Sequence, residues 1–97
     1  MNTRSEHDLL GDLDVPEDAW YGIQTLRAAT NFAITGVPIS HFPELIQALA
    51  QVKQASALTN RDFGLLSQEK TDVIISACED IASGLYHDQF IVDVIQG

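Results

Sequence analysis

Four polar or aromatic side chains near the start of the chain are the first candidates for chemistry. They are spaced four, three and four residues apart, which would align them on one face of a helix, and they are Trp20, Gln24, Arg27 and Asn31. No acidic residue lies within this stretch, so a half-buried Arg27 needs an acceptor from elsewhere in the chain. Two alternatives stay open. Arg27 and Gln24 bind backbone carbonyls or a distant carboxylate, or they help to shape a site for an anion.

The histidines do not form a metal-binding pattern. His7, His41 and His87 are far apart in the sequence, and no pair has the spacing of metal ligands, so we predict no metal site. His87 is followed by Asp88, a pair that could act in acid–base catalysis, but a solvated loop pair is the favoured interpretation.

The remaining nucleophile types give no catalytic set either. Cys78 lies on the apolar face of an expected helix, where a thiol is normally buried and inert. No serine stands in a nucleophile elbow, and no glycine-rich phosphate loop is present. The residues alone therefore predict no catalytic residue.

The composition limits the class of protein and its partners. The 97 residues suit one small domain, spanning 1–97, with a core of modest size. Fourteen acidic residues against five basic ones give a net charge of -9, which argues against nucleic acid and anionic membrane as partners. No apolar run is long enough to span a bilayer, and no secretory signal is visible. The single cysteine is compatible with the reducing cytoplasm.

Apolar periodicity predicts a mainly α fold with three helices, at about 18–32, 41–63 and 67–84. Asp18, Ser40 and Ser67 are expected to cap their starts, and Gly64 and Gly84 to end the second and third. The first helix is apolar over most of its circumference, which predicts burial on several sides. On the second helix, one face is expected to hold Leu45, Ile46, Leu49, Val52, Ser56, Thr59 and Phe63. The rest of that helix is expected to be slim and to permit close helix contact, because it carries Ala48, Ala50, Ala55 and Ala57.

Short extended pieces complete the expected fold. Residues 9–15 resemble a hairpin in which Gly11 and Asp12 supply the turn. The segment before it is expected to be loose unless it pairs as a strand. Residues 86–89 are expected to form a loop, and the apolar run 90–95 is short for a helix.

Several stretches share their residue types and spacing with one known family. They are Asp8-Leu9-Leu10-Gly11, Val15-Pro16, the run from Ala19 to Ala28, Asn31-Phe32, Pro43-Glu44-Leu45, Val52-Lys53, Ala55, Asn60, Leu66, Ala77-Cys78, Asp88-Gln89-Phe90, Val92-Asp93-Val94 and Gln96-Gly97. Together they resemble the amino-terminal region of the aspartate ammonia-lyases, in the aspartase/fumarase superfamily. Class II fumarate hydratases share this layout, but Tyr21, Leu26 and Ala28 favour the aspartases.

The resemblance implies a function for a longer parent enzyme. Such a parent reversibly eliminates ammonia from L-aspartate to give fumarate, without an organic cofactor, although a divalent metal activates some members. It also implies a cytoplasmic homotetramer whose central helical bundle and carboxy-terminal domain are absent here. The substrate-binding Gly-Thr-Ser run and the loop with the catalytic serine are expected beyond Gly97. Thr25 and Arg27 are therefore only indirect candidates for substrate binding, and the chain alone is expected to be inactive.

Two alternatives to the aspartase interpretation stay open. The chain could belong to a class II fumarate hydratase, or it could be a free-standing acidic helical interaction module. Under the favoured interpretation, the isolated chain should bear unburied apolar surface and associate with itself. The residues expected to form that surface are Trp20, Ile23, Leu26, Phe90, Ile91, Val92, Val94 and Ile95.

Overall fold

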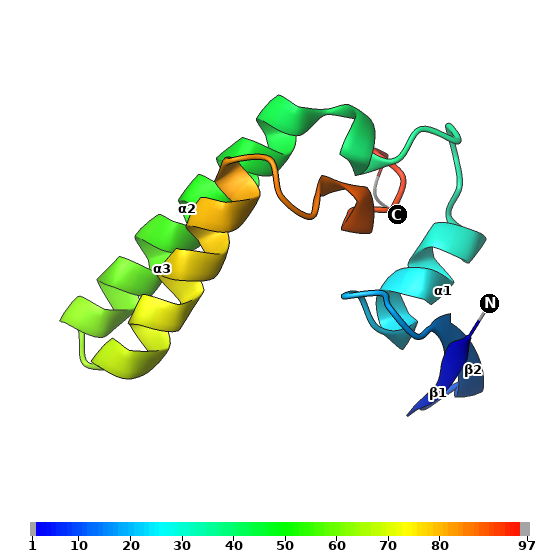
Figure 1. The fold of residues 1–97 in the computed structure, drawn as a ribbon, viewed down its shortest axis with the longest axis horizontal. Helices are drawn as coiled ribbons and strands as arrows, with labels where there is room; N and C mark the ends of the chain where they lie inside the picture. Colours follow the sequence, from blue (N-terminus) through cyan, green and yellow to red (C-terminus); the bar gives the residue numbers. More distant parts are fainter. Residues whose placement is uncertain (1, 96–97) are drawn as a thin grey trace. The chain divides into compact units, whose positions relative to one another are not determined.

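The computed structural model describes residues 2–95 and confirms a mainly helical fold with one small β-hairpin. The chain divides into two compact units (Figure 1). The first comprises Met1–His41 together with Asp88–Gly97, and the second comprises Phe42–His87. The first unit is therefore discontinuous in sequence, and the second is inserted within it.

The first unit opens with an antiparallel hairpin that is longer than the sequence predicted. Strand β1 (Thr3–Asp8) pairs with β2 (Gly11–Pro16), and Asp8 faces Gly11 at the tip. The predicted turn at Gly11-Asp12 is wrong, because Leu9 and Leu10 form the turn and Gly11 already belongs to β2. Gly11 has a φ of 114°, which side chains disfavour, and this conformation lets the chain enter β2 directly after the turn.

Helix α1 (Ile23–Asn31) begins five residues later than predicted, so the expected Asp18 cap is wrong. The cause is the hairpin register, which places Pro16 within β2 rather than in a first helical turn. Burial of α1 on several sides is also wrong, because Ile23 is its only buried residue. Trp20 lies before the helix and is 75% exposed.

The two segments of the first unit are joined by backbone pairing. The amides of Ile39 and Ser40, in the short 3-10 helix η1 (Ile39–His41), donate to the carbonyls of Val92 and Phe90. The Val94 amide donates to the Val37 carbonyl, on the far side of a bridge between Pro38 and Asp93. We call residues 90–95 the strap, because they bind the end of the unit to the loop after α1. The stretch predicted as a loop before it contains a short 3-10 turn, η2 (His87–Gln89).

The second unit is a helical hairpin of α2 (Pro43–Asp62) and α3 (Gln68–Ala82), which lie side by side in Figure 1. The predicted cap of α3 is confirmed, since the Ser67 hydroxyl accepts the Lys70 amide at 3.2 Å. Gly64 and Gly84 follow the helix ends with φ of 74° and 111°, as expected. The Ser40 cap is wrong, because Phe42 occupies the N-cap of α2 and Ser40 lies in η1.

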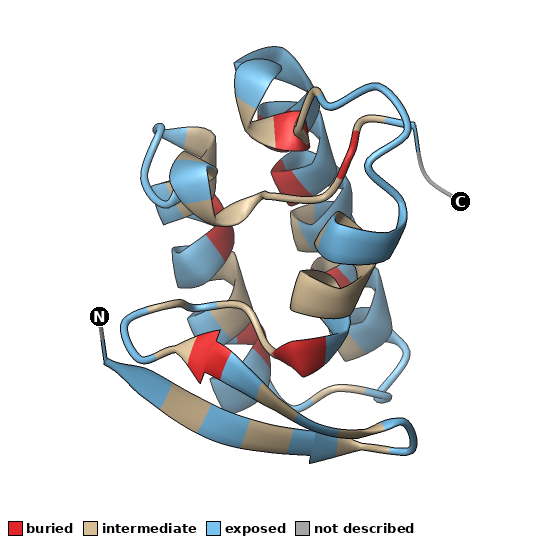
Figure 2. Cartoon of the chain, turned by 90° about the vertical axis from the view of Figure 1, so that its right-hand side faces the viewer, coloured by how far each residue is buried: buried red, intermediate tan, exposed pale blue. Residues whose placement is uncertain are grey.

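Small side chains allow α2 and α3 to pack closely. The buried residues of α2 are Ile46, Ala50 and Ala57, and those of α3 are Thr71 and Cys78 (Figure 2). Burial of Cys78 agrees with the sequence prediction. Of the residues expected to share one face of α2, only Ile46 is buried. Helix α2 therefore buries Ala50 and Ala57, as the expected close helix contact requires, and leaves most of its larger apolar residues exposed.

Replacing Ile46 should test which face of α2 holds the hairpin together. Ile46 is fully buried, so Ile46→Ala should lower the free energy of unfolding by about 2–4 kcal/mol through lost burial and a cavity. Val73 is 67% exposed, so the control Val73→Ala should change it by less than about 0.5 kcal/mol. Urea unfolding followed by circular dichroism measures both, and equal losses would contradict the packing described here.

Candidate functional site

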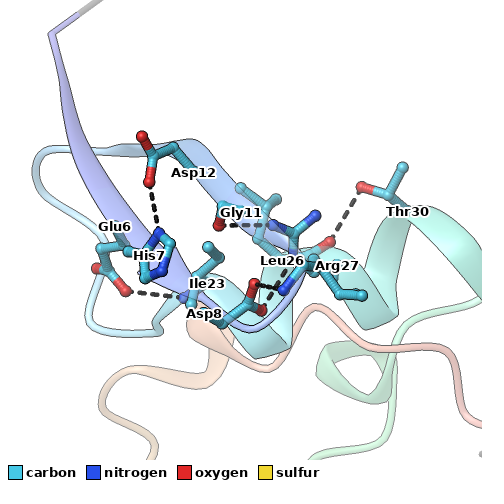
Figure 3. Close-up of polar contacts among 10 residues, drawn as sticks. Glu6, His7, Asp8, Gly11, Asp12, Ile23, Leu26, Arg27 and Thr30 are labelled. Carbon is cyan, nitrogen blue, oxygen red and sulfur yellow. Dashed lines mark hydrogen bonds and ion pairs between the residues drawn. The ribbon is translucent and has the colours of Figure 1, made fainter.

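Arg27, the leading candidate from the sequence, is bound within the first unit. Its Nε donates to Asp8 Oδ2 at 2.9 Å, and one terminal nitrogen donates to the Gly11 carbonyl at 3.1 Å (Figure 3). Both charged side chains are largely shielded, with 21% of Arg27 and 13% of Asp8 exposed. Of the two alternatives left open by the sequence, the structure therefore shows the distant carboxylate. Thr25, the other candidate, is half-buried on the same helix.

A second arginine, which sequence reasoning missed, binds the hairpin to the start of α1. Arg4 pairs with Glu6 at 2.7 Å, and its terminal nitrogens donate to three backbone carbonyls, those of Pro16, Glu17 and Tyr21. Glu6 in turn accepts the amide of Ile23, the first residue of α1, at 2.9 Å. A detectable signal was present, because Arg4, Glu6 and Asp8 alternate along one face of a strand.

Glu6 takes the place of an N-cap side chain for α1. The N-cap residue is Gly22, which has no side chain to satisfy the first amides of the helix. A Cβ at Gly22 would lie 3.1 Å from Glu6 Oε1, closer than most such contacts. Glycine at this position therefore lets the carboxylate from β1 approach the helix start.

The arginines hold both strand carboxylates in their charged form. The hydrogen bond from Arg4 is the main cause that lowers the pKa of Glu6, and the Ile23 amide adds to it. The hydrogen bond from Arg27 lowers the pKa of Asp8, against a smaller opposing effect of burial. This electrostatic pattern belongs to carboxylates that stabilise a fold, whereas a general acid at neutral pH needs a raised pKa.

Asp93 in the strap is the third carboxylate with a shifted pKa, and the donors that bind it are backbone amides and a hydroxyl. It is 6% exposed and accepts four hydrogen bonds of 2.8–2.9 Å, from the amides of Gly36 and Ile95 and from the amide and hydroxyl of Thr35. Burial acts to raise its pKa, but the hydrogen bonds outweigh burial and lower it. Sequence reasoning did not single out Asp93.

The other candidate residues do not join Arg27. The amide of Trp20 donates to Gln89 Oε1 at 2.9 Å, and Trp20 lies outside α1, so the predicted four-residue helical stripe does not form. His7 contacts Asp12 at the exposed face of the hairpin, and His87 Nε2 lies 2.7 Å from the Ile81 carbonyl. These histidines are therefore distributed over separate parts of the chain.

No ligand set for a metal is found within residues 2–95, where no three His, Cys, Asp or Glu side chains gather suitably. An open pocket near the start of α3 is lined by Ser67, Glu69, Lys70, Val73 and Ile74, which form no recognisable catalytic set. Across the same residues, no helix has the length and hydrophobicity needed to cross a bilayer. The arrangement at α1 is thus a structural polar cluster.

Comparison with known proteins assigns the chain to an enzyme family. Residues 11–97 match the family described as Lyase, and the chain is 55% identical over 96 residues to aspartate ammonia-lyase of Pseudomonas aeruginosa. The chain belongs to the aspartase/fumarase superfamily of lyases. It is also 44% identical, over 93 residues, to class II fumarate hydratase of Halobacterium salinarum. The resemblance found in the sequence is therefore confirmed.

A solved structure supports the same assignment at the level of the fold. The fumarate lyase:delta crystallin of Brucella melitensis bound to cobalt superposes with a TM-score of 0.89 and is 49% identical. That match covers 99% of this chain but 21% of the other. The match to the Pseudomonas aeruginosa enzyme likewise covers 99% of this chain and 20% of that enzyme. It therefore spans about a fifth of the lyases that it matches.

The three lowered pKa values predict acid-sensitive stability. Ionised Glu6, Asp8 and Asp93 stabilise the folded state above their unfolded pKa values, and this contribution is lost as the pH falls below about 4. Arg27→Gln should lower the unfolding midpoint by a few degrees at pH 7. The deficit should shrink near pH 3, because the stabilisation that the lowered pKa of Asp8 provides is progressively lost below the unfolded pKa of this carboxyl.

Thermal unfolding followed by circular dichroism at the two pH values measures this difference. Arg61→Gln is the matched control, because Arg61 pairs only with the exposed neighbour Asp62 and such surface pairs contribute little. A deficit for Arg27→Gln that is equally large at both pH values would contradict a role of the Asp8 charge.

Proposed function

We propose that this chain is the amino-terminal domain, residues 1–97, of an aspartate ammonia-lyase that converts L-aspartate reversibly to fumarate and ammonia. The observation that carries the proposal is the 55% identity to the Pseudomonas aeruginosa enzyme across 99% of this chain. In this reaction a base removes a proton from C3, and hydrogen-bond donors hold the dianionic intermediate. The proposal assigns the base and the carboxylate-binding residues to the remaining part of the parent enzyme.

The role proposed for this domain is to hold α1 in a fixed position within the parent. Arg27 is bound to Asp8 and Gly11, and the first amide of α1 is bound to Glu6, so the helix is tied to the hairpin at two points. Thr25 and Arg27 act indirectly in this proposal, by positioning the helix rather than by contacting substrate.

The proposal extends to the setting of the parent enzyme. We place it in the cytoplasm as a homotetramer that uses no organic cofactor. Any divalent metal that activates the parent would be held elsewhere, because residues 2–95 offer no ligand set. L-aspartate and fumarate are its proposed small-molecule partners, and the charge of -9 disfavours nucleic acid.

A chimeric enzyme tests the proposal directly. This chain should replace the matching segment of the Pseudomonas aeruginosa aspartate ammonia-lyase and leave ammonia elimination from L-aspartate within about tenfold of the parent rate. The same exchange into a class II fumarate hydratase is the control, because the 44% identity to one such enzyme favours it as the alternative. A chimera that folds and works only in the fumarate hydratase would overturn the aspartase assignment.

The 97-residue chain by itself should show no turnover of L-aspartate or fumarate, since the proposed base lies outside it. Fumarate absorbance in the ultraviolet measures both directions of the reaction. Activity that copurifies with the chain and disappears with Arg27→Gln would mean that the catalytic residues are within it.

A further inference from the structure

Helix α2 and its C-cap residue Phe63 carry an exposed stripe with the spacing of a coiled-coil seam. The residues of the stripe are separated by four, three, four, three and four positions, and they are Leu45, Leu49, Val52, Ser56, Thr59 and Phe63. Its four apolar members are exposed by 39%, 47%, 65% and 77% in chain order. Alternating steps of three and four are the pattern by which one helix packs along another. We call this set the α2 stripe.

The stripe faces away from the helix that α2 already contacts. Ile46, Ala50 and Ala57 are the buried residues of α2, and at 3.6 residues per turn the centre of the stripe lies roughly 120° around the helix from them. The Thr59 hydroxyl donates to the Ala55 carbonyl one turn earlier at 2.9 Å, which satisfies this polar group within α2. The stripe is therefore an additional helix-packing face over roughly 27 Å of helix.

The distribution of charge favours α2 over α3 as the surface through which two copies of the chain could meet. The chain has a net charge of -9, so two copies repel each other over most of their surfaces. Helix α3 contributes to this repulsion, because four acidic residues and only Lys70 lie within it. Helix α2 is neutral, since Glu44 and Asp62 balance Lys53 and Arg61. Two copies can thus approach through α2 at a lower electrostatic cost than through α3.

The side chains of the stripe also complement those of a second, antiparallel α2. When Leu45 of one helix faces Phe63 of the other, Leu49 faces Thr59 and Val52 faces Ser56, so the four inner positions pair a larger residue with a smaller one. Alanines 48 and 55 border the stripe and allow close approach. We propose that the α2 stripe binds a second copy of this chain as an antiparallel helix pair. This inference is independent of the proposed enzymatic function.

One contact opposes the pairing and makes it weak. Lys53 borders the stripe near its centre, so the two lysines of an antiparallel pair lie close to the two-fold axis. Screening of this repulsion, and of the acidic charge elsewhere, should make the association stronger at high salt. The α2 stripe shares no residue with the apolar surface expected from the sequence. Of the residues of that expected surface, Ile23 is in fact buried and Leu26 is half-buried.

Sedimentation equilibrium of the full chain, from micromolar to about millimolar concentration, tests the proposal. The chain should form dimers, and Leu49→Lys should weaken dimerisation roughly tenfold or more by placing an ammonium group in the stripe. Gln51→Lys is the matched control, because it adds the same charge at an exposed position of α2 outside the stripe. Circular dichroism should show unchanged helix content in both variants.

A variant that is expected to strengthen the pairing distinguishes a specific loss of dimerisation from a general loss of folding. Ser56→Leu should tighten dimerisation several-fold by adding apolar contact within the stripe, whereas Ser76→Leu, on exposed α3 surface, should not. A chain that stays monomeric at the highest concentration would overturn the proposal. So would dimers that respond equally to Leu49→Lys and Gln51→Lys, since another surface would then form the contact.

Discussion

The contact of two strand carboxylates with α1 is the constraint on which the first half of the chain depends. A two-stranded hairpin and a nine-residue helix are each marginal in water when they stand alone. Within residues 2–41, the buried apolar residues are Val15, Ile23 and Ile39, which is a small core. The contacts of Glu6 and Asp8 therefore contribute stability that apolar burial provides in larger domains. Arg4 and Arg27 neutralise the charges of these two carboxylates.

The second unit could be predicted well because its signals are local. The Ser67 hydroxyl caps α3 by accepting a hydrogen bond from the amide of Lys70, three residues later in the sequence. Gly64 and Gly84 follow the ends of α2 and α3 with positive φ angles, which depend on the glycines alone. The apolar residues expected to share one face of α2 are mostly exposed, whereas Ala50 and Ala57, two of the four alanines expected to permit close helix contact, are buried.

The first unit was harder to predict because its decisive contacts are distant in sequence. Nothing near Gly22 reveals that Glu6, on the preceding hairpin, binds the first amide of α1. The absence of an acidic neighbour correctly indicated a remote partner for Arg27, but only the strand register identifies Asp8. Asp93 was missed for the same reason, since Thr35 and Gly36 precede it by more than fifty residues.

The strap has a consequence for the order in which the chain can fold during synthesis. Helices α2 and α3 pack on each other within the compact unit Phe42–His87, so their hairpin can form once residue 87 has left the ribosome. The first unit must wait for Asp93, because this carboxylate accepts the hydrogen bonds of the Thr35 amide, the Thr35 hydroxyl and the Gly36 amide. Gln47 already binds the Ala82 carbonyl across the open end of the helical hairpin. A preformed hairpin thus shortens the effective loop that the strap must close and lowers its entropic cost.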